Sequence, residues 1–265
     1  MVVSHATNLA DPHAVSLAPV QERPRIALVT GASSGIGEAT VRVLATEGFE
    51  TIAAARRLER CQRLAAEVGG RALRLDVSDR ASVTELAEAV PEVDVVVHSA
   101  GGALGLDPVE DADEGRWREM WESNVAGVMR VTKALMPALR AGRDPQIVIV
   151  GSVAGVEVYE GGGGYTAAKY AAHALAQTLR LELLANEIRV TEVAPGMVET
   201  EFSLVRFEGD SERAAGVYRG LEPLHAGDVA DAIAFCVTRP AHVDVDYLGI
   251  KPTAQATAKI AYRRD

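Results

Sequence analysis

A glycine-rich turn between an apolar segment and a helical pattern restricts the fold of this chain more than any other feature. Residues 25–30 are mostly apolar and run directly into the turn at 31–37, and a helical pattern begins at Glu38. A strand, a glycine turn and a helix in this order bring main-chain N–H groups and a helix N-terminus close to a bound pyrophosphate. The segment therefore predicts an α/β fold with a dinucleotide site; the alternative is an ordinary loop.

Further apolar runs extend this pattern along the chain. The runs at 50–55, 93–97 and 146–150 predict strands, and the last two are continuous enough for strands that are covered on both faces. Alternating strand and helix patterns predict one α/β domain at 24–265 rather than two. Residues 1–23 lack the basic start and long apolar core of a secretory signal, so we expect a flexible extension there.

The residues after the second predicted strand indicate which dinucleotide is bound. That strand ends without the carboxylate that would bind a ribose 2′-hydroxyl, and Arg56 and Arg57 follow it. Two guanidiniums can hold a 2′-phosphate through charge-assisted hydrogen bonds, with help from the Ser33 hydroxyl in the glycine turn. We therefore expect NADP or NADPH; the alternative is that both arginines only begin a surface helix at 58–68.

A second group of residues predicts acid/base chemistry. Tyr165 and Lys169 are four residues apart, so one helical turn places a phenol and an ammonium on the same face. A nearby cation favours the phenolate of a group whose ordinary pKa is about 10. Ser152 follows the strand at 146–150, at the sheet edge where such folds bind ligands. The alternative is that these residues have no catalytic role: Tyr165 would be a partly buried side chain, Lys169 a solvated one, and Ser152 an ordinary turn residue.

These motifs together resemble the short-chain dehydrogenase/reductase family, and the resemblance covers residues 25–262. It implies a single-domain Rossmann fold, a doubly wound parallel sheet of about seven strands with helices on both faces. It implies an NADP-dependent alcohol dehydrogenase or carbonyl reductase whose catalytic residues are Asn124, Ser152, Tyr165 and Lys169. The implied cofactor contacts are Gly31, Ser33, Ser34, Gly35, Ile36, Gly37, Arg56, Arg57, Asp76, Val77, Ser99, Ala100, Gly101, Tyr165, Lys169, Pro195, Gly196, Val198 and Thr200.

The resemblance also implies a mechanism. Lys169 and the positive nicotinamide ring would lower the pKa of Tyr165, so that the phenolate takes the alcohol proton. Ser152 would hold the substrate oxygen, and Asn124 would anchor a water that links Lys169 to solvent. One departure stands out: the usual Asn-Asn-Ala-Gly of the fourth strand begins here with His98 and Ser99, so the asparagine contacts normally made there are in question.

Within the family, the segments 200–210, 240–243 and 251–253 resemble NADP-dependent 3-hydroxy acid and serine dehydrogenases. This narrower resemblance implies a small 3-hydroxy acid or β-hydroxy amino acid as substrate, bound with Ser152, Tyr165 and Arg206. A guanidinium can bind a carboxylate through two parallel hydrogen bonds. For Arg206, the alternative is a side chain that is solvated or paired with Glu208 or Asp210. For the protein, the alternatives are a reductase of larger ketones and a non-catalytic NADP-binding sensor.

Residues 202–221 mix charge, glycine and aromatic side chains, and we expect a substrate loop there. Between 111 and 141 an apolar helical stripe predicts a helix that covers the sheet. The family resemblance implies that this helix and the Tyr165 helix form the interfaces of a homotetramer, a dimer of dimers. The alternative is a stripe that is buried in the core only.

Composition excludes several classes of partner. A formal charge of −10 argues against nucleic acid and anionic membranes. No run of eighteen apolar residues predicts a membrane span. Cys61 and Cys236 lack disulfide or metal spacing, so we expect reduced thiols in the cytoplasm, and the histidines give no reason to expect a metal.

Overall fold

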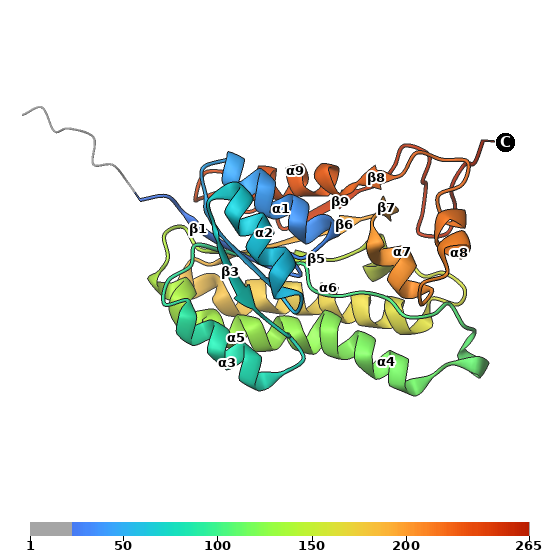
Figure 1. The fold of residues 1–265 in the computed structure, drawn as a ribbon, viewed down its shortest axis with the longest axis horizontal. Coiled ribbons are helices and arrows are strands. Elements are labelled where there is room, and N and C mark those ends of the chain that lie inside the picture. Colours follow the sequence, from blue (N-terminus) through green and yellow to red (C-terminus); the bar gives the residue numbers. More distant parts are fainter. Residues whose placement is uncertain (1–22, 265) are drawn as a thin grey trace, which may run out of the picture.

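The computed structural model of the protein describes residues 23–264, and its centre is a seven-stranded parallel sheet (Figure 1). The expected extension at 1–23 lies outside the described residues except for Arg23, so the boundary at 24 stays a prediction. The strand order is β3-β2-β1-β4-β5-β6-β9. The strands are β1 Ile26–Thr30, β2 Glu50–Ala55, β3 Arg71–Arg74, β4 Val95–His98, β5 Gln146–Val150, β6 Arg189–Pro195 and β9 Tyr247–Ile250. Two short strands, β7 Val198–Glu199 and β8 Leu224–His225, pair with each other.

Helices cover both faces of this sheet, so the predicted doubly wound α/β fold is confirmed (Figure 1). Helices α1, α2 and α9 pack on one face, and α3, α5 and α6 pack on the other. The helices are α1 Gly35–Thr46, α2 Leu58–Val68, α3 Arg80–Ala89, α4 Glu114–Trp121, α5 Gly127–Ala141, α6 Gly163–Leu183, α7 Glu201–Arg206, α8 Ser211–Gly216 and α9 Ala226–Val237. The helix expected at 58–68 is therefore α2, and the expected substrate loop at 202–221 contains α8 and most of α7.

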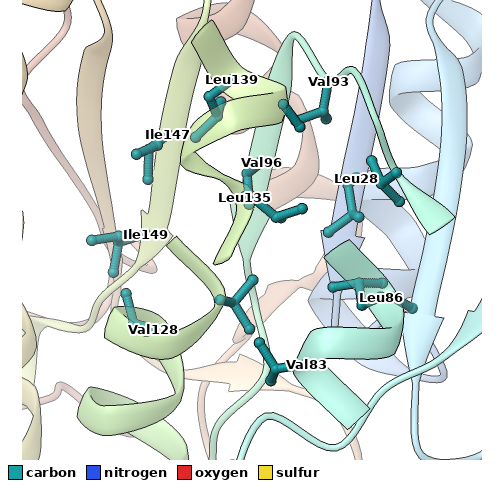
Figure 2. Packing of buried hydrophobic residues seen from close by; sticks show 14 of the residues in the cluster. Leu28, Val83, Leu86, Val93, Val96, Val128, Leu135, Leu139, Ile147 and Ile149 are labelled. Atoms are coloured by element: carbon teal, nitrogen blue, oxygen red, sulfur yellow. The ribbon is translucent and has the colours of Figure 1, made fainter. Parts of the chain in front are cut away.

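The core explains why the strand sequences are apolar without alternation. On one face, Leu28, Val96 and Ile147 of three neighbouring strands pack with Leu135 and Leu139 of α5 (Figure 2). These side chains are fully buried, and each such burial stabilises the fold by about 1.5–3 kcal/mol relative to exposure. Because helices cover both faces, most positions along a central strand meet apolar neighbours.

One strand begins later than the apolar run predicts. The run starts at 93, whereas β4 starts at Val95. Just before it, Asp94 is buried, and its carboxylate accepts hydrogen bonds from Ile26 N at 2.6 Å and from Arg23 Nη1 at 2.7 Å. The carboxylate thus joins the start of β1 to the approach to β4.

The helical stripe between 111 and 141 is divided into two helices. A π-helical turn, η2 Glu122–Ala126, lies between α4 and α5. Single π-turns within helices are frequently found at functional sites. Here the turn contains Asn124. On either side, Trp117 and Trp121 of α4 are only partly covered, while Leu135 of α5 is fully buried.

The strand order reverses between β2-β1 and β4-β5, because β1 pairs with β2 on one side and with β4 on the other. Ligands of such sheets bind beyond the carboxyl ends of the strands at this reversal. Among residues 23–264, no helix is long and apolar enough to span a bilayer. The same range holds no cluster of three or more His, Cys, Asp or Glu side chains suited to a metal ion, and both cysteines are buried and free.

Candidate active site

A cavity of about 640 Å³ opens at the carboxyl ends of the central strands. Its volume lies within the usual range for small-molecule and cofactor pockets. Almost all residues predicted to bind cofactor or substrate line it, namely Gly31, Ser33, Ser34, Gly35, Ile36, Arg56, Arg57, Asp76, Val77, Ser99, Ala100, Gly101, Ser152, Tyr165, Lys169, Pro195, Gly196, Val198, Thr200 and Arg206. Gly37 and Asn124 lie just behind its wall.

The glycine turn provides a close-packed cradle at one end of this cavity. Gly31 has φ +68°, and a Cβ there would lie 2.7 Å from the Ser99 carbonyl oxygen. A Cβ on Gly37 would lie 2.5 Å from the Gly31 carbonyl oxygen. Both positions therefore require glycine, and the close approach allows α1 to point its N-terminus at the cavity.

Thr30 fixes the neighbouring loop after β4. Its Oγ1 accepts hydrogen bonds from the backbone N–H groups of Ser99 and Ala100, each at 3.1 Å. The loop that departs from the family pattern thus keeps its backbone at the cavity wall. His98 itself is buried and bonded to Thr132 Oγ1 at 3.0 Å, and burial lowers its pKa to about 4. His98 is therefore neutral at pH 7.

Arg57 connects the glycine turn to α7. Its Nε donates to Ser33 Oγ at 3.0 Å, and its Nη2 donates to Ser34 Oγ at 2.6 Å. Its Nη1 lies 2.8 Å from a carboxylate oxygen of Glu201, the first residue of α7. Hydrogen bonds from Arg60 and Arg57 lower the pKa of Glu201 to about 2. Arg57, rather than Arg56, is therefore the guanidinium held against the turn.

Helix α6 and the loop after β5 bring together the predicted acid/base residues. Lys169 Nζ donates to the Val150 carbonyl at 2.9 Å and lies 5.7 Å from the ring centroid of Tyr165. Ser152, Tyr165 and Lys169 are all buried. Burial lowers the pKa of Lys169 to about 8.

The protonation of Tyr165 differs from what the four-residue spacing with Lys169 suggests. Burial raises the pKa of Tyr165 above its ordinary value; a hydrogen bond with Ser152 and the charge of Arg206 act in the opposite direction. Desolvation outweighs the neighbouring charges because the phenolate would lose its water shell. The phenol is therefore protonated at neutral pH in this structure.

The π-turn fixes Asn124 behind the cavity wall. Its Nδ2 donates to the carbonyls of Met120 at 2.8 Å and Gly102 at 2.9 Å. Its Oδ1 is buried without a hydrogen-bond partner among the described residues. That oxygen lies so near Gly101 that a Cβ there would be 2.5 Å away. An unpaired buried acceptor is suited to hold a water molecule.

Arg206, at the end of α7, lies over the predicted acid/base tyrosine. Its Nε donates to the Gly105 carbonyl at 2.8 Å, and its Nη1 donates to Tyr159 Oη at 3.0 Å. The guanidinium carbon lies 5.8 Å from the ring centroid of Tyr165, and Nη2 is buried without a partner among the described residues. The expected alternative partners are engaged elsewhere: Glu208 pairs with Arg116, and Asp210 caps α8.

Three residues that shape this site carry no signal in the sequence. Glu201 holds Arg57, Tyr159 holds Arg206, and Phe202 packs the edge of its ring against Tyr165 with centroids 5.6 Å apart. These contacts join segments that are distant in sequence. No local pattern signals them.

Residues 25–210 match the family model for short chain dehydrogenase. The chain belongs to the short-chain dehydrogenase/reductase family. It is 55% identical to an uncharacterized oxidoreductase of Mycobacterium tuberculosis, over 89% of this chain and 94% of the relative. As a member of this family the protein is an oxidoreductase, and the resemblance stated from the motifs is confirmed.

Relatives with named activities resemble the protein over a similar length. Sulfoacetaldehyde reductase 2 of Chromohalobacter salexigens is 41% identical over 91% of this chain and 99% of its own. The NADP-dependent 3-hydroxy acid dehydrogenase of Schizosaccharomyces pombe is 39% identical, over 89% and 96% respectively. The closed form of serine dehydrogenase complexed with NADP⁺ superposes with a TM-score of 0.85 at 36% identity, covering 91% of this chain and all of that one.

Proposed function

We propose that this oxidoreductase transfers a hydride between NADP(H) and a small 3-hydroxy acid or β-hydroxy amino acid. The observation that supports this most directly is Arg206, which brings an unpaired, buried N–H group beside Tyr165. A buried guanidinium N–H without a partner is costly, so an anionic group of the substrate fits that position.

The residues of the glycine turn fit a dinucleotide phosphate. The cradle at Gly31 and Gly37 leaves no room for a side chain, as a close backbone approach to pyrophosphate requires. Beside it, Arg57 with Ser33 and Ser34 forms a cluster of donors for a 2′-phosphate. Two of the relatives, an NADP-dependent 3-hydroxy acid dehydrogenase and the serine dehydrogenase complexed with NADP⁺, support the same choice. When bound, NADP(H) supplies or accepts the hydride.

The acid/base roles follow from the geometry of α6 and the loop after β5. Tyr165 exchanges the proton of the substrate hydroxyl, and Ser152, which is bonded to it, orients the substrate oxygen. The ammonium of Lys169 favours the phenolate during this exchange. Asn124 holds a water with its unpaired Oδ1 and so connects Lys169 to solvent.

The named relatives agree in one chemical feature. Sulfoacetaldehyde, a 3-hydroxy acid and serine each carry an anionic group one carbon away from the carbon that is reduced or oxidised. Arg206 supplies a charge complementary to that group. Its hydrogen bonds to Gly105 and Tyr159 orient the remaining N–H group, so less ordering is required when substrate binds.

The experiment compares substrates with and without the anion. NADPH and NADH oxidation is measured on short β-oxo acids, sulfoacetaldehyde and neutral ketones, with wild type, Arg206→Ala and Arg213→Ala. Arg213 is a matched control because it is an exposed arginine of α8 outside the cavity lining. We expect Arg206→Ala to lower kcat/KM on the acids about 10- to 100-fold, the value of a hydrogen bond to a charged group, and to spare neutral ketones. Activity confined to bulky neutral ketones would contradict the proposal.

We also propose that the protein is a cytoplasmic homotetramer. Apolar side chains remain exposed on neighbouring helices, namely Trp121 of α4, Met129 of α5, and Tyr170 and Leu181 of α6. Such a surface suits subunit contact. Light scattering at several concentrations tests this, and a monomer at micromolar concentration would contradict it. The two buried free thiols suit a reducing compartment.

A further inference from the structure

A buried carboxylate lies directly behind the predicted catalytic lysine. Glu192, on β6, is 1% exposed and pairs in the sheet with Ile149 of β5. The next residue of β5, Val150, accepts the hydrogen bond from Lys169 Nζ. Glu192 therefore lies in the strand beside the one that holds the lysine, although it does not line the cavity.

His173 fixes the orientation of this carboxylate. It follows Lys169 by one turn of α6, and its Nδ1 lies 2.5 Å from Glu192 Oε2. Its Nε2 lies 2.7 Å from the side-chain amide nitrogen of Gln177, one further turn along. An amide N–H donating to Nε2 leaves the proton of a neutral imidazole on Nδ1, where it donates to the carboxylate.

The second carboxylate oxygen has no hydrogen-bond partner. Glu192 Oε1 is buried and unpaired among the described residues. It packs against Gly151, where a Cβ would lie only 2.1 Å away. Gly151 follows Val150 and precedes Ser152, so its missing side chain leaves room for this oxygen beneath the site.

A buried charge with an unpaired oxygen requires a compensating charge nearby. Among the described residues, His173 of α6 contacts Glu192 directly, and the charge of Glu192 acts on Lys169 of α6 and Tyr247 of β9. Burial raises the pKa of Tyr247, followed by the charges of Glu192 and Glu157, so Tyr247 stays neutral. Lys169 supplies the opposite charge, and the attraction of Glu192 opposes the desolvation of Lys169.

We propose that Glu192, held in place by its hydrogen bond with His173, is a positioning residue that maintains the buried Lys169 as an ammonium beside Tyr165. This inference rests on the proposed function, in which the ammonium favours the phenolate. In this arrangement, Gly151 leaves room for Glu192 Oε1. The four-residue intervals between Lys169, His173 and Gln177 place these three side chains on one face of α6. Without the carboxylate, burial would turn Lys169 into a neutral amine within the working pH range.

The test measures the titration of Lys169 directly. The chain's other lysines are Lys133, Lys251 and Lys259, so ¹³Cε-lysine NMR gives few signals, and Lys169→Arg assigns the relevant one. We expect Glu192→Gln to move the Lys169 midpoint down by about one pH unit, because a nearby opposite charge favours the ionised form. Glu182→Gln, which removes an exposed carboxylate from the same helix, serves as the matched control and leaves the midpoint unchanged.

Activity provides a second measurement on the same variants. We measure the pH dependence of kcat for NADPH-dependent reduction. In Glu192→Gln, the alkaline limb of this profile should shift together with the NMR midpoint of Lys169. Glu192→Asp keeps the charge and should retain most of the wild-type profile. An equal loss of kcat in both variants, with no shift of the limb, indicates a purely structural role and overturns the proposal.

His173→Ala keeps the test decisive if Glu192→Gln does not fold. Loss of the Nδ1 donor removes the hydrogen bond that holds the carboxylate in place behind Lys169, so the Lys169 midpoint should again fall. An unchanged midpoint in the folded variant overturns the proposal. Two other results would contradict the proposed function instead: a wild-type protein without dehydrogenase turnover, or an active Tyr165→Phe variant. In either case, the NMR midpoint of Lys169 still decides the role of Glu192.

Discussion

The guanidinium of Arg57 and the carboxylate of Glu201 join the cofactor end of the cavity to α7, with Nη1 and Oε2 2.8 Å apart. Arg57 also binds the side chains of Ser33 and Ser34 in the glycine turn. One arginine thus connects the proposed 2′-phosphate position with the helix that carries Arg206. Both partners are substantially exposed, so the pair contributes little to stability and its significance lies in ligand binding.

Replacing Arg57 by Ala should weaken NADPH binding and leave NADH binding nearly unchanged. The lost charge-assisted hydrogen bonds correspond to about 10- to 100-fold in Kd. Fluorescence titration with both nucleotides measures this. Arg60→Ala is the control, because Arg60 also pairs with Glu201 but does not line the cavity. An equal loss for NADH and NADPH would show that Arg57 does not contact a 2′-phosphate.

Replacing Tyr165 by Phe should lower kcat by at least about 10²-fold while NADPH binding is retained. The phenol is buried against Ser152, so the substitution removes the exchangeable proton with little change of shape. Steady-state kinetics and a nucleotide titration separate the two effects. Tyr170→Phe, at an exposed tyrosine of the same helix, should behave as wild type. Substantial turnover in Tyr165→Phe would remove this residue from the acid/base role.

Replacing Gly37 by Ala should destabilise the fold by about 1–3 kcal/mol, since the added methyl group meets the Gly31 carbonyl oxygen and forces the turn to move. The same movement should weaken nucleotide binding. Urea denaturation measures the first effect. The matched control is Gly227→Ala in α9, where nothing lies within 4 Å of the new Cβ, and we expect a gain of about 0.4–1 kcal/mol. Equal stability of the two variants would contradict the tight cradle.

His98 should make the protein less stable as the pH falls below neutrality. Burial lowers its folded-state pKa from 6.5 to about 4, so between these values the unfolded chain binds a proton that the folded chain does not. Linkage then predicts a loss of about 2 kcal/mol from this group between pH 7 and pH 5. In His98→Asn, which cannot titrate, the pH dependence of urea unfolding should be smaller by that amount. An identical slope in both proteins would mean that His98 is charged in the fold.

The local sequence predicted the elements of the fold well. Continuous apolar runs mark strands that are covered on both faces, and the glycines at 31 and 37 are required by backbone contacts only a few residues away in the chain. The spacing of Tyr165 and Lys169 follows from helix geometry alone. Such features depend on short-range sterics and hydrophobic periodicity, which a sequence shows directly.

Sequence alone determined the doubly wound sheet, the family, and most of the side chains that line the cavity. Only the tertiary structure decided the partners and charge states of those side chains. Arg57 pairs with Glu201, Arg206 binds Tyr159, and Glu192 lies behind Lys169. The two residues of each pair are more than twenty positions apart in the sequence. The physical reason is that burial and long-range contacts, which no local pattern shows, set the desolvation and the fields that these groups experience.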